Sequence, residues 1–285
     1  MIHRHTRKTV YAAKYQRPLV IGFAFALGAC TVSQDQEVEL GRENAAEINA
    51  QLPIVNDPAI ATYIQDLGMS IASKTSRSDF DWHFYVVNTK QVNAFALPGG
   101  FVYVNRGLIE SADHLDELAG SIGHEIGHVV QRHSVKQMQD AQKTNVGIAV
   151  LCTLTNICHS GLGQAAVQVG GSAYFARHSR LDELQADSEG VVNVARAGYD
   201  PHGIPDLFKL LLKEREYQPT KVEGWFMDHP MEEARIDRAN RLIATVPEAG
   251  GKRFLIDTPA FHEFKNRVAA LPVPPKPRPL PGEGP

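Results

Sequence analysis

The sequence predicts an α+β fold that is mainly helical, with one small sheet beside a central helix. Two observations lead to this expectation. Apolar residues recur three and four positions apart in several segments, which is the spacing of a helix that buries one face. Strand-like runs, rich in aromatic and β-branched residues, occur in residues 82–87 and 93–109. We therefore expect helices to dominate the fold and the strands to form a minor part of it.

The composition limits the classes of protein that this chain can belong to. With 285 residues, it can hold one large domain or two small ones. Its formal net charge of −3 is close to neutral, so no patch for binding nucleic acid is indicated. Three cysteines are too few for a disulfide-rich scaffold. We expect one folded domain over residues 38–271 and a mobile, proline-rich tail over residues 272–285.

The start of the chain resembles an export signal. Residues 1–29 begin with basic side chains, contain no acid, and end in an uncharged apolar run that is short for a membrane span. The last three of them and Cys30 resemble the box of bacterial lipoproteins, where the signal is removed and the cysteine carries lipid. We expect a signal peptide over 1–29 and a lipidated tether over 30–37. Thr31, in place of aspartate, resembles a signal for the outer membrane; an incidental cysteine after a plain signal peptide is the alternative.

Two helices and three strands are expected next. Helical patterning covers residues 38–49 and 58–73, and residues 82–87 are strand-like. Within residues 93–109, two strand runs flank Leu-Pro-Gly-Gly, a turn signal. The first of these runs can form an exposed strand edge beside the central helix, to which a peptide substrate adds as an extra strand. A purely structural hairpin is the alternative. The residues of the expected edge are Asn93, Ala94, Phe95 and Ala96.

The most informative segment is the expected helix that contains residues 121–133 and the pattern H-E-x-x-H. Residues four apart share one face of a helix, so His124 and His128 point the same way and can bind one metal ion together. Glu125 can instead take a proton from a water molecule at the metal, which is the arrangement of a zinc hydrolase. The neighbouring residues are small or apolar, which indicates a mostly buried helix where unpaired imidazoles would be costly. An amphipathic helix with two surface histidines is the alternative.

The flanks of this helix predict where it begins and ends. Ser111 or Asp113 can cap its start. We expect it to end near His133. Because His133 follows His128 by five residues, a continuous helix turns it off the metal-binding face. We favour a surface position for His133 over one behind the ligands.

The segment that follows, residues 145–175, is apolar, rich in glycine and uncharged. Polar residues and glycines interrupt it, so a buried or membrane-apposed hairpin is favoured over a transmembrane helix. Cys152 and Cys158 lie within it. They can form a disulfide in an oxidising compartment or remain two buried free cysteines, and the sequence does not decide between these alternatives.

A later helix is the best source of a third metal ligand. Residues 180–197 are strongly helical and end before Gly198. Catalytic zinc sites combine three protein ligands with water, and two histidines with one glutamate are a known set, so Glu183 would complete the site. Asp187, one turn further on the same face, can accept the free ring N–H of a ligand histidine and fix its tautomer. The alternative is that Glu183 and Asp187 are both exposed to solvent on the surface of the helix.

Further helices are expected over residues 200–216, 231–245 and 259–270. His229 directly precedes the second of these, next to Pro230, which suits the start of a helix. A surface histidine in a loop is the alternative for His229.

Four segments, taken together, resemble one family. In chain order they read NAFALPGG, GHEIGHVVQRH, DELQADSEG with AGYDP, and DHPMEEAR. This pattern resembles the HtpX-like zinc endopeptidases, which are relatives of the CAAX prenyl proteases, and in particular their exported bacterial branch. The resemblance covers about residues 38–245. It implies a gluzincin fold, in which helices surround a small sheet and hold one zinc ion.

The resemblance also implies roles for individual residues. Glu125 matches the catalytic base, and Asp187 matches the acid that follows the third ligand. His229 and Arg235 match residues of the histidine-proline segment near the metal, and either can assist with the charge that develops in the reaction. The implied zinc ligands are His124, His128 and Glu183.

The implied function is zinc-dependent cleavage of internal peptide bonds in unfolded or misassembled proteins of the bacterial envelope. The enzyme would be periplasmic and anchored by lipid, in the outer membrane. A lipoprotein chaperone that holds such proteins, with zinc mainly structural, is the alternative from another class. A metzincin is excluded because its longer pattern needs glycine and histidine where Gln131 and Ser134 stand. An aminopeptidase would need an acidic anchor for a free amine, and no motif supplies one.

Overall fold

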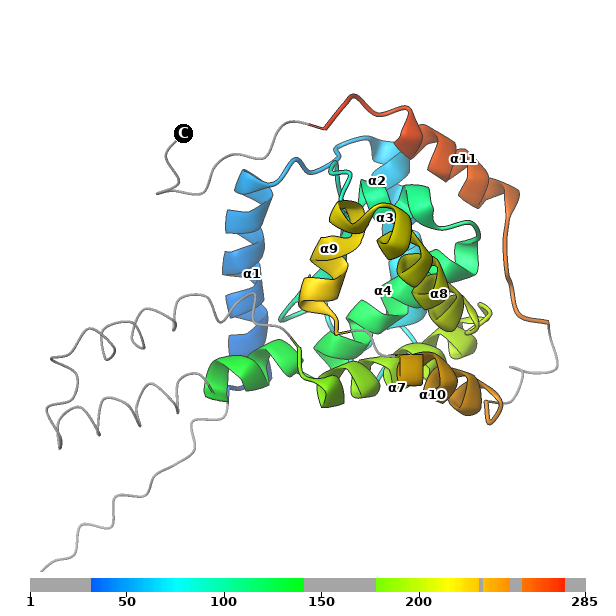
Figure 1. The fold of residues 1–285 in the computed structure, drawn as a ribbon. Coiled ribbons are helices and arrows are strands. Elements are labelled where there is room, and N and C mark those ends of the chain that lie inside the picture. The colour runs from blue at the N-terminus through cyan, green and yellow to red at the C-terminus, as the bar shows by residue number, and fades with distance from the viewer. Residues whose placement is uncertain (1–31, 141–177, 231–232, 247–252, 275–285) are drawn as a thin grey trace, which may run out of the picture. The chain divides into compact units, whose positions relative to one another are not determined.

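Figure 1 shows the computed structural model, which describes residues 32–140, 178–230, 233–246 and 253–274. The expected signal segment with Cys30, the apolar stretch with Cys152 and Cys158, and most of the proline-rich tail lie outside these residues. Within the described part of the chain, no helix is both long and apolar enough to cross a membrane.

Two helices precede the sheet, and each begins with a side-chain cap. α1 (Gln34–Gln51) follows Ser33, whose hydroxyl accepts a hydrogen bond from the backbone N–H of Gln36. α2 (Pro58–Ala72) follows Asp57, whose carboxylate accepts two backbone hydrogen bonds, and proline suits its first position. The apolar residues of α2 that recur three and four apart are mostly buried. Both helices predicted in this region are therefore confirmed.

Three strands form the sheet: β1 (His83–Val87), β2 (Ala94–Leu97) and β3 (Phe101–Asn105). Their order is β1-β3-β2, with β1 parallel and β2 antiparallel to β3, so β2 lies at an edge of the sheet. The turn from β2 to β3 contains Gly99 and Gly100 with φ of 78° and 98°, a conformation that glycine adopts without strain. The predicted strand runs and the turn between them are confirmed.

Different helices bury the two faces of the sheet. One face packs into the main hydrophobic core together with α2 and α4 (Leu115–Val130). The other face carries Tyr85, Phe95 and Tyr103, whose rings stack with centroids 4.9 and 4.8 Å apart. α1 lies against this second face, where the hydroxyl of Tyr103 donates a hydrogen bond to Asn49. The C-terminal half of α1 therefore packs on the face of the sheet opposite to the main core.

The start of α4 differs from the prediction. Neither Ser111, which ends the short helix α3 (Arg106–Ser111), nor Asp113 is its N-cap; that position belongs to His114. The first backbone N–H of the helix, at Leu115, donates to the carboxylate of Asp257. The free N–H groups at the start of a helix need partners, and here one partner comes from the far end of the chain.

The end of α4 also differs from the prediction. The helix stops at Val130 and does not continue to His133. Arg132 adopts a left-handed conformation with φ of 59°, and a second helical stretch covers residues 133–140. The chain therefore changes direction directly after the H-E-x-x-H pattern.

In Figure 1, α4 lies in the middle of the described helices, and α7 and α8 pack directly against it. Gly123 and Gly127 make the approach of α7 possible, because a β-carbon on Gly127 would lie only 2.6 Å from the carbonyl oxygen of Ala186. From residue 178 on, the described residues form α7 (Arg180–Ala197), α8 (Gly203–Tyr217), α9 (Pro219–Asp228), α10 (Glu233–Ile243) and α11 (Pro259–Ala269).

The predicted fold class, mainly helical α+β with a small sheet beside the central helix, is confirmed. The helices expected over 180–197, 200–216, 231–245 and 259–270 are present with small shifts of their ends. The sequence analysis did not predict α9, which lies between two of the expected helices. α9 is short and begins at Pro219, directly after α8 ends.

A buried carboxylate near the start of α4 makes stability depend on pH. Asp116 is 5% exposed, and burial raises its pKa to about 7, helped by the nearby charges of Glu117 and Asp200. The folded-state pKa lies above the unfolded value, so the folded protein binds the extra proton and stability falls as the pH rises from about 4 to about 7. We expect Asp116→Asn to be more stable than the parental protein above about pH 8, by on the order of 2 kcal/mol, and equal to it near about pH 4.

Thermal melts of the two proteins over this pH range check the prediction. A gain on the order of 2 kcal/mol corresponds to a melting temperature roughly 4–8 °C higher for a domain of this size. Equal melting temperatures of the two proteins at alkaline pH would show that burial of the charged Asp116 carboxylate does not destabilise the folded protein.

Candidate metal centre

The three side chains that the sequence proposed as ligands meet inside the protein. α4 carries His124 and His128 on one face, and α7 presents Glu183 to them. The Nε2 atoms of the two histidines lie 3.1 Å apart, and carboxylate oxygens of Glu183 lie 3.4 Å from His124 Nε2 and 3.5 Å from His128 Nε2. All three side chains are at most 3% exposed. Two imidazoles and one carboxylate therefore converge away from solvent.

The spacing of these donor atoms suits a zinc ion. Zinc binds nitrogen and oxygen ligands at about 2.0–2.1 Å in a tetrahedral arrangement, which sets neighbouring ligand atoms about 3.3 Å apart. The observed separations of 3.1, 3.4 and 3.5 Å lie around this value. Two histidines with one glutamate are also a known ligand set of catalytic zinc. The residues present therefore fit the ion.

His229 lies at the fourth corner of this cluster. It follows the last residue of α9, and its Nδ1 lies 3.3 Å from His124 Nε2 and 3.3 Å from Glu183 Oε1. The four residues together form a group whose donor atoms could hold one metal ion. The sequence analysis expected His229 close to the metal; the structure places it among the donor atoms, where a catalytic zinc site keeps an open position.

Glu125 lies beside the cluster but does not belong to it. Its side chain is 1% exposed, and its Oε1 lies 3.4 Å from Nε2 of His229. Burial raises the pKa of Glu125 to about 7. A carboxyl group with a pKa near neutrality can both accept and return a proton at physiological pH, as a general base must do.

Asp187 and Arg235 support the cluster from behind. Asp187 Oδ1 lies 2.9 Å from Nδ1 of His124, which is the contact that its predicted role requires. Arg235 binds both oxygens of Asp187 at 2.8 and 2.9 Å, and its Nη1 lies 2.8 Å from Glu183. Burial alone would lower the pKa of His124, but its hydrogen bonds to Asp187 and Glu183 raise it to about 9. Arg235 is 3% exposed, and besides these two carboxylates it binds the backbone carbonyl oxygen of Pro230 at 2.9 Å.

The preferred surface position for His133 is wrong. Its side chain is fully buried, and its Nδ1 lies 2.9 Å from Nδ1 of His128. The prediction assumed one continuous helix. The left-handed residue Arg132, for which the sequence contains no turn signal, instead brings His133 back to the ring of His128. The sequence analysis also missed His178 and Trp225. The His178 ring lies 3.9 Å from that of His128, and Trp225 packs on His229 with centroids 4.7 Å apart.

The strand edge expected to hold substrate lies beside α4, as predicted, because β2 pairs with β3 on one side and contacts α4. Its first residues are less open than expected. Asn93 is 9% exposed and donates a hydrogen bond of 2.8 Å to Asp228, and Ala94 is buried. Phe95 and Ala96 are half-buried. The side chain of Asn93 therefore ties the start of β2 to the end of α9.

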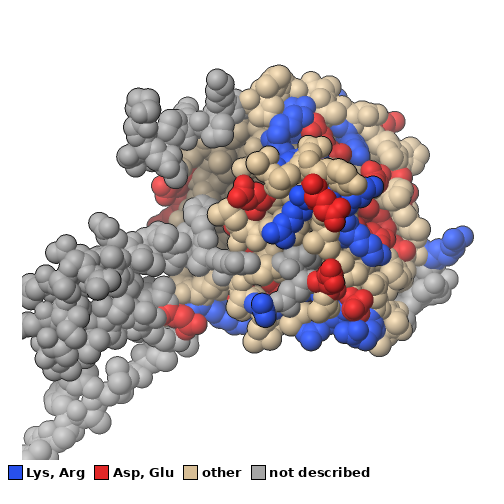
Figure 2. Space-filling view, in the orientation of Figure 1, with Lys and Arg blue, Asp and Glu red and all other residues tan. Residues whose placement is uncertain are grey.

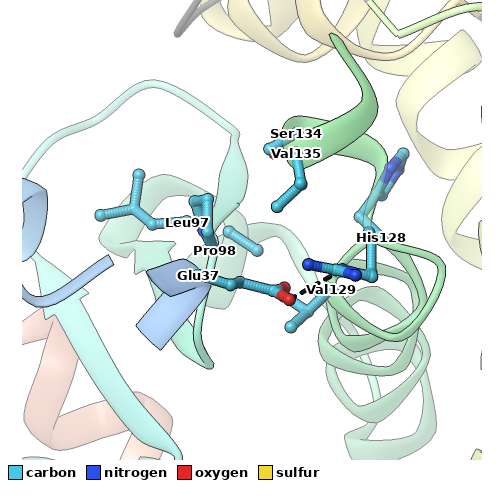
Figure 3. Close-up of a pocket in the computed structure, with 9 residues that line it drawn as sticks. Glu37, Leu97, Pro98, His128, Val129, Ser134 and Val135 are labelled. Atoms are coloured by element: carbon cyan, nitrogen blue, oxygen red, sulfur yellow. Dashed lines mark ion pairs between the residues drawn. The ribbon is translucent and has the colours of Figure 1, made fainter. Parts of the chain in front are cut away.

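A buried ion-pair group lies at the C-terminal end of α4. Figure 3 shows Glu37 of α1 reaching toward the end of α4, near His128 and Val129, beside a cavity of about 10 Å³. Glu37 is fully buried, and its Oε2 lies 2.8 Å from Arg132 Nε and 3.1 Å from Arg77 Nη1. The N-terminal helix is therefore attached to the turn that follows the motif.

Comparison with known proteins places this site in a family. The model of Peptidase family M48 matches residues 58–243. The chain is 30% identical over 236 residues to the beta-barrel assembly-enhancing protease of Escherichia coli (strain K12), covering 79% of this chain and 48% of that protein. It is 28% identical over 238 residues to the mitochondrial metalloendopeptidase OMA1 of Schizosaccharomyces pombe, covering 81% and 67%.

The protein from Yersinia pestis with the same name as the Escherichia coli relative is 30% identical over 222 residues, covering 74% of this chain and 46% of that protein. The chain thus spans about half the length of these bacterial relatives. The family match begins at α2 and ends with α10, so it includes both helices that supply the buried donors and the residues between α9 and α10. The resemblance found in the sequence, to HtpX-like zinc endopeptidases, is consistent with this match. Because the match covers well over half of the chain, the chain belongs to peptidase family M48.

Proposed function

We propose that this protein is a zinc-dependent endopeptidase of the bacterial cell envelope. The observation that carries the proposal is the buried cluster of His124, His128 and Glu183, with Glu125 beside it but outside it. Relatives of this chain are named as a protease and as a metalloendopeptidase. These names favour a peptidase over a chaperone in which zinc is structural.

In this proposal, each side chain has a separate part in the reaction. A zinc ion held by the three ligands would lower the pKa of water and polarise the scissile carbonyl. Glu125 accepts the proton of the attacking water and later passes it to the leaving amine. Asp187 holds the ring of His124, and Arg235 balances the charge of the two buried carboxylates. Arg235 acts on the ligands and their support, because its donors already bind these acids.

The position of His229 implies a movement. A zinc ion held by the three ligands would use its open position for water or a substrate carbonyl, and Nδ1 of His229 lies there, 3.3 Å from two of the donor atoms. His229 must therefore turn aside when substrate binds. Its place at the end of α9, next to Glu125, allows the displaced ring to donate a hydrogen bond to the oxyanion.

The edge of β2 is the proposed binding site for the substrate backbone. An extended peptide can add to β2 on the side away from β3, with Phe95 and Ala96 as the more open positions. Because a strand edge binds main chain and does not need a chain end, it suits cleavage within a polypeptide. On the face drawn in Figure 2, basic and acidic side chains are interspersed, so this face does not select substrates by one sign of charge.

The proposed location rests on the start of the chain. The basic and apolar residues 1–29 and the following Cys30 support export, lipid attachment and a periplasmic position at the outer membrane. The bacterial relatives are named for the assembly of β-barrels. This name supports the proposal that the substrates are unfolded or misassembled envelope proteins.

Metal removal tests the proposed function. The purified protein should contain one zinc ion per chain and cleave casein. Dialysis against a chelator should lower the rate by at least about a hundredfold, and added zinc should restore it, because both the water and the carbonyl depend on the ion. A protein that is free of metal and still cleaves casein at the original rate would contradict the proposal.

A further inference from the structure

We propose that His133 is a positioning residue that holds the ring of His128 in the orientation and tautomer needed to bind zinc. The proposal rests on the zinc site proposed above and adds a residue behind it. His133 follows His128 by five residues, is fully buried and places its Nδ1 2.9 Å from Nδ1 of His128. The Nε2 atom of His128 faces the other two ligands, so His133 contacts the opposite side of the ligand ring.

The partners on the far side of His133 define the direction of these hydrogen bonds. Nε2 of His133 lies 3.0 Å from Oε1 of Gln185 and 3.5 Å from Oδ1 of Asp182, and both oxygens can only accept. Nε2 therefore carries the proton of His133, and Nδ1 remains an acceptor. The N–H that it accepts belongs to Nδ1 of His128. This leaves the lone pair of His128 on Nε2, the atom that faces Glu183.

In this arrangement, α7 orients both ligand histidines. Asp187 reaches Nδ1 of His124 directly, at 2.9 Å. Gln185, two residues earlier on α7, reaches Nδ1 of His128 through His133. A ligand histidine whose second nitrogen has a fixed partner keeps one tautomer and one ring orientation. Because His133 is an imidazole and not a carboxylate, it supplies this support without a further buried charge.

A local break in the helix makes the contact possible. Five residues of a continuous α-helix rotate by about 140°, which would point His133 away from His128. Arg132 instead adopts φ of 59°, a strained conformation for a residue with a side chain. Its guanidinium pairs with the buried Glu37 at 2.8 Å and donates to the carbonyl oxygen of Val32 at 2.6 Å. These contacts with α1 and with Val32, two residues before its start, hold the turn that brings His133 back to His128.

Two substitutions of His133 separate positioning from packing. His133→Leu removes the acceptor and keeps a buried side chain of similar size, so zinc affinity should fall about 10- to 100-fold. His133→Asn places an oxygen acceptor near the position of Nδ1 and should return the affinity to within about threefold of the parental value. The zinc dissociation constant is measured by competition with a coloured chelator. Melting temperatures of the zinc-free proteins show that each variant folds.

His178→Leu is the matched control. The ring of His178 also lies against the ring of His128, but its Nδ1 is hydrogen-bonded to Gln137 at 3.0 Å. Its loss should leave zinc affinity nearly unchanged. If His128, His133 and His178 held a second ion between them, the parental protein would bind two zinc ions per chain and both leucine variants would bind one. That stoichiometry would overturn the proposal.

A spectroscopic readout tests the tautomers directly. Nitrogen-15 NMR of the zinc-loaded protein should show the proton of His133 on Nε2 and that of His128 on Nδ1. The opposite tautomer of His133, parental zinc affinity in a folded His133→Leu, or a failure of His133→Asn to restore affinity would each overturn the proposal. None of these results bears on peptide cleavage, which the removal of metal tests separately.

Discussion

Glu125→Gln is expected to bind zinc as the parental protein does and to cleave casein about a hundred- to ten-thousandfold more slowly. Glutamine has nearly the same size but cannot accept the proton of the attacking water. Glu125 does not belong to the donor cluster, so the loss of its charge should leave the ion in place. The measurements are the zinc content per chain and the rate of casein cleavage by the zinc-loaded variant.

Glu39→Gln is the control for this substitution. It makes the same chemical change on α1, where Glu39 is exposed and pairs with Arg42. Its cleavage rate should equal that of the parental protein. If Glu125→Gln cleaved casein at the parental rate, another group would take the proton. A Glu125→Gln protein without zinc would instead place Glu125 among the ligands.

Arg235→Leu is expected to have the largest effect on stability. Arg235 is 3% exposed and lies between Glu183 and Asp187, which are also buried. Its removal leaves two buried carboxylates without their cation, and breaking a buried ion pair from one side costs on the order of 3–5 kcal/mol. For a domain of this size, the melting temperature of the zinc-free protein should fall by about 10 °C. Bound zinc should recover part of the loss, because it also compensates the charge of Glu183.

Arg267→Leu is the matched control, since Arg267 binds both oxygens of Asp57 at 2.8 Å in the same forked geometry but at the surface. Exposed pairs contribute little, so its melting temperature should change far less. Arg235→Lys keeps the charge without the fork and should fall between the parental protein and Arg235→Leu. An Arg235→Leu protein of parental stability that has lost cleavage would show that Arg235 acts on the substrate and not on the carboxylates.

Helical spacing predicted correctly which of the proposed ligand and support residues share a helix face. His124 and His128 share a face because they lie four residues apart in one helix, and this holds whatever the helix packs against. The same rule placed Glu183 and Asp187 together on a second helix. The structure brings these two pairs into contact, with Glu183 at 3.4 Å and Asp187 at 2.9 Å from opposite nitrogens of the His124 ring. Their roles in binding zinc and in catalysis stay predictions until they are measured.

Residue spacing did not predict the contacts between segments that lie far apart in the sequence. The partner of Leu115 at the start of α4 is Asp257, and no local pattern connects the two. Arg235 was expected near the metal, but its forked contact with Asp187 depends on how α10 packs against α7. His229 reaches the donor atoms only because α9 ends beside them, and α9 itself was missed.

The sequence by itself determined the fold class, the central helix and the residues that share each helical face, because these follow from spacing along one segment. Only the tertiary structure decided that His229 lies at the fourth corner and that His133 lies behind His128. The first depends on the packing of α9 over the site. The second depends on the left-handed turn at Arg132, which contacts with Val32 and Glu37, about a hundred residues earlier in the chain, hold in place. Such contacts form only when separate segments fold together, so spacing along the sequence cannot predict them.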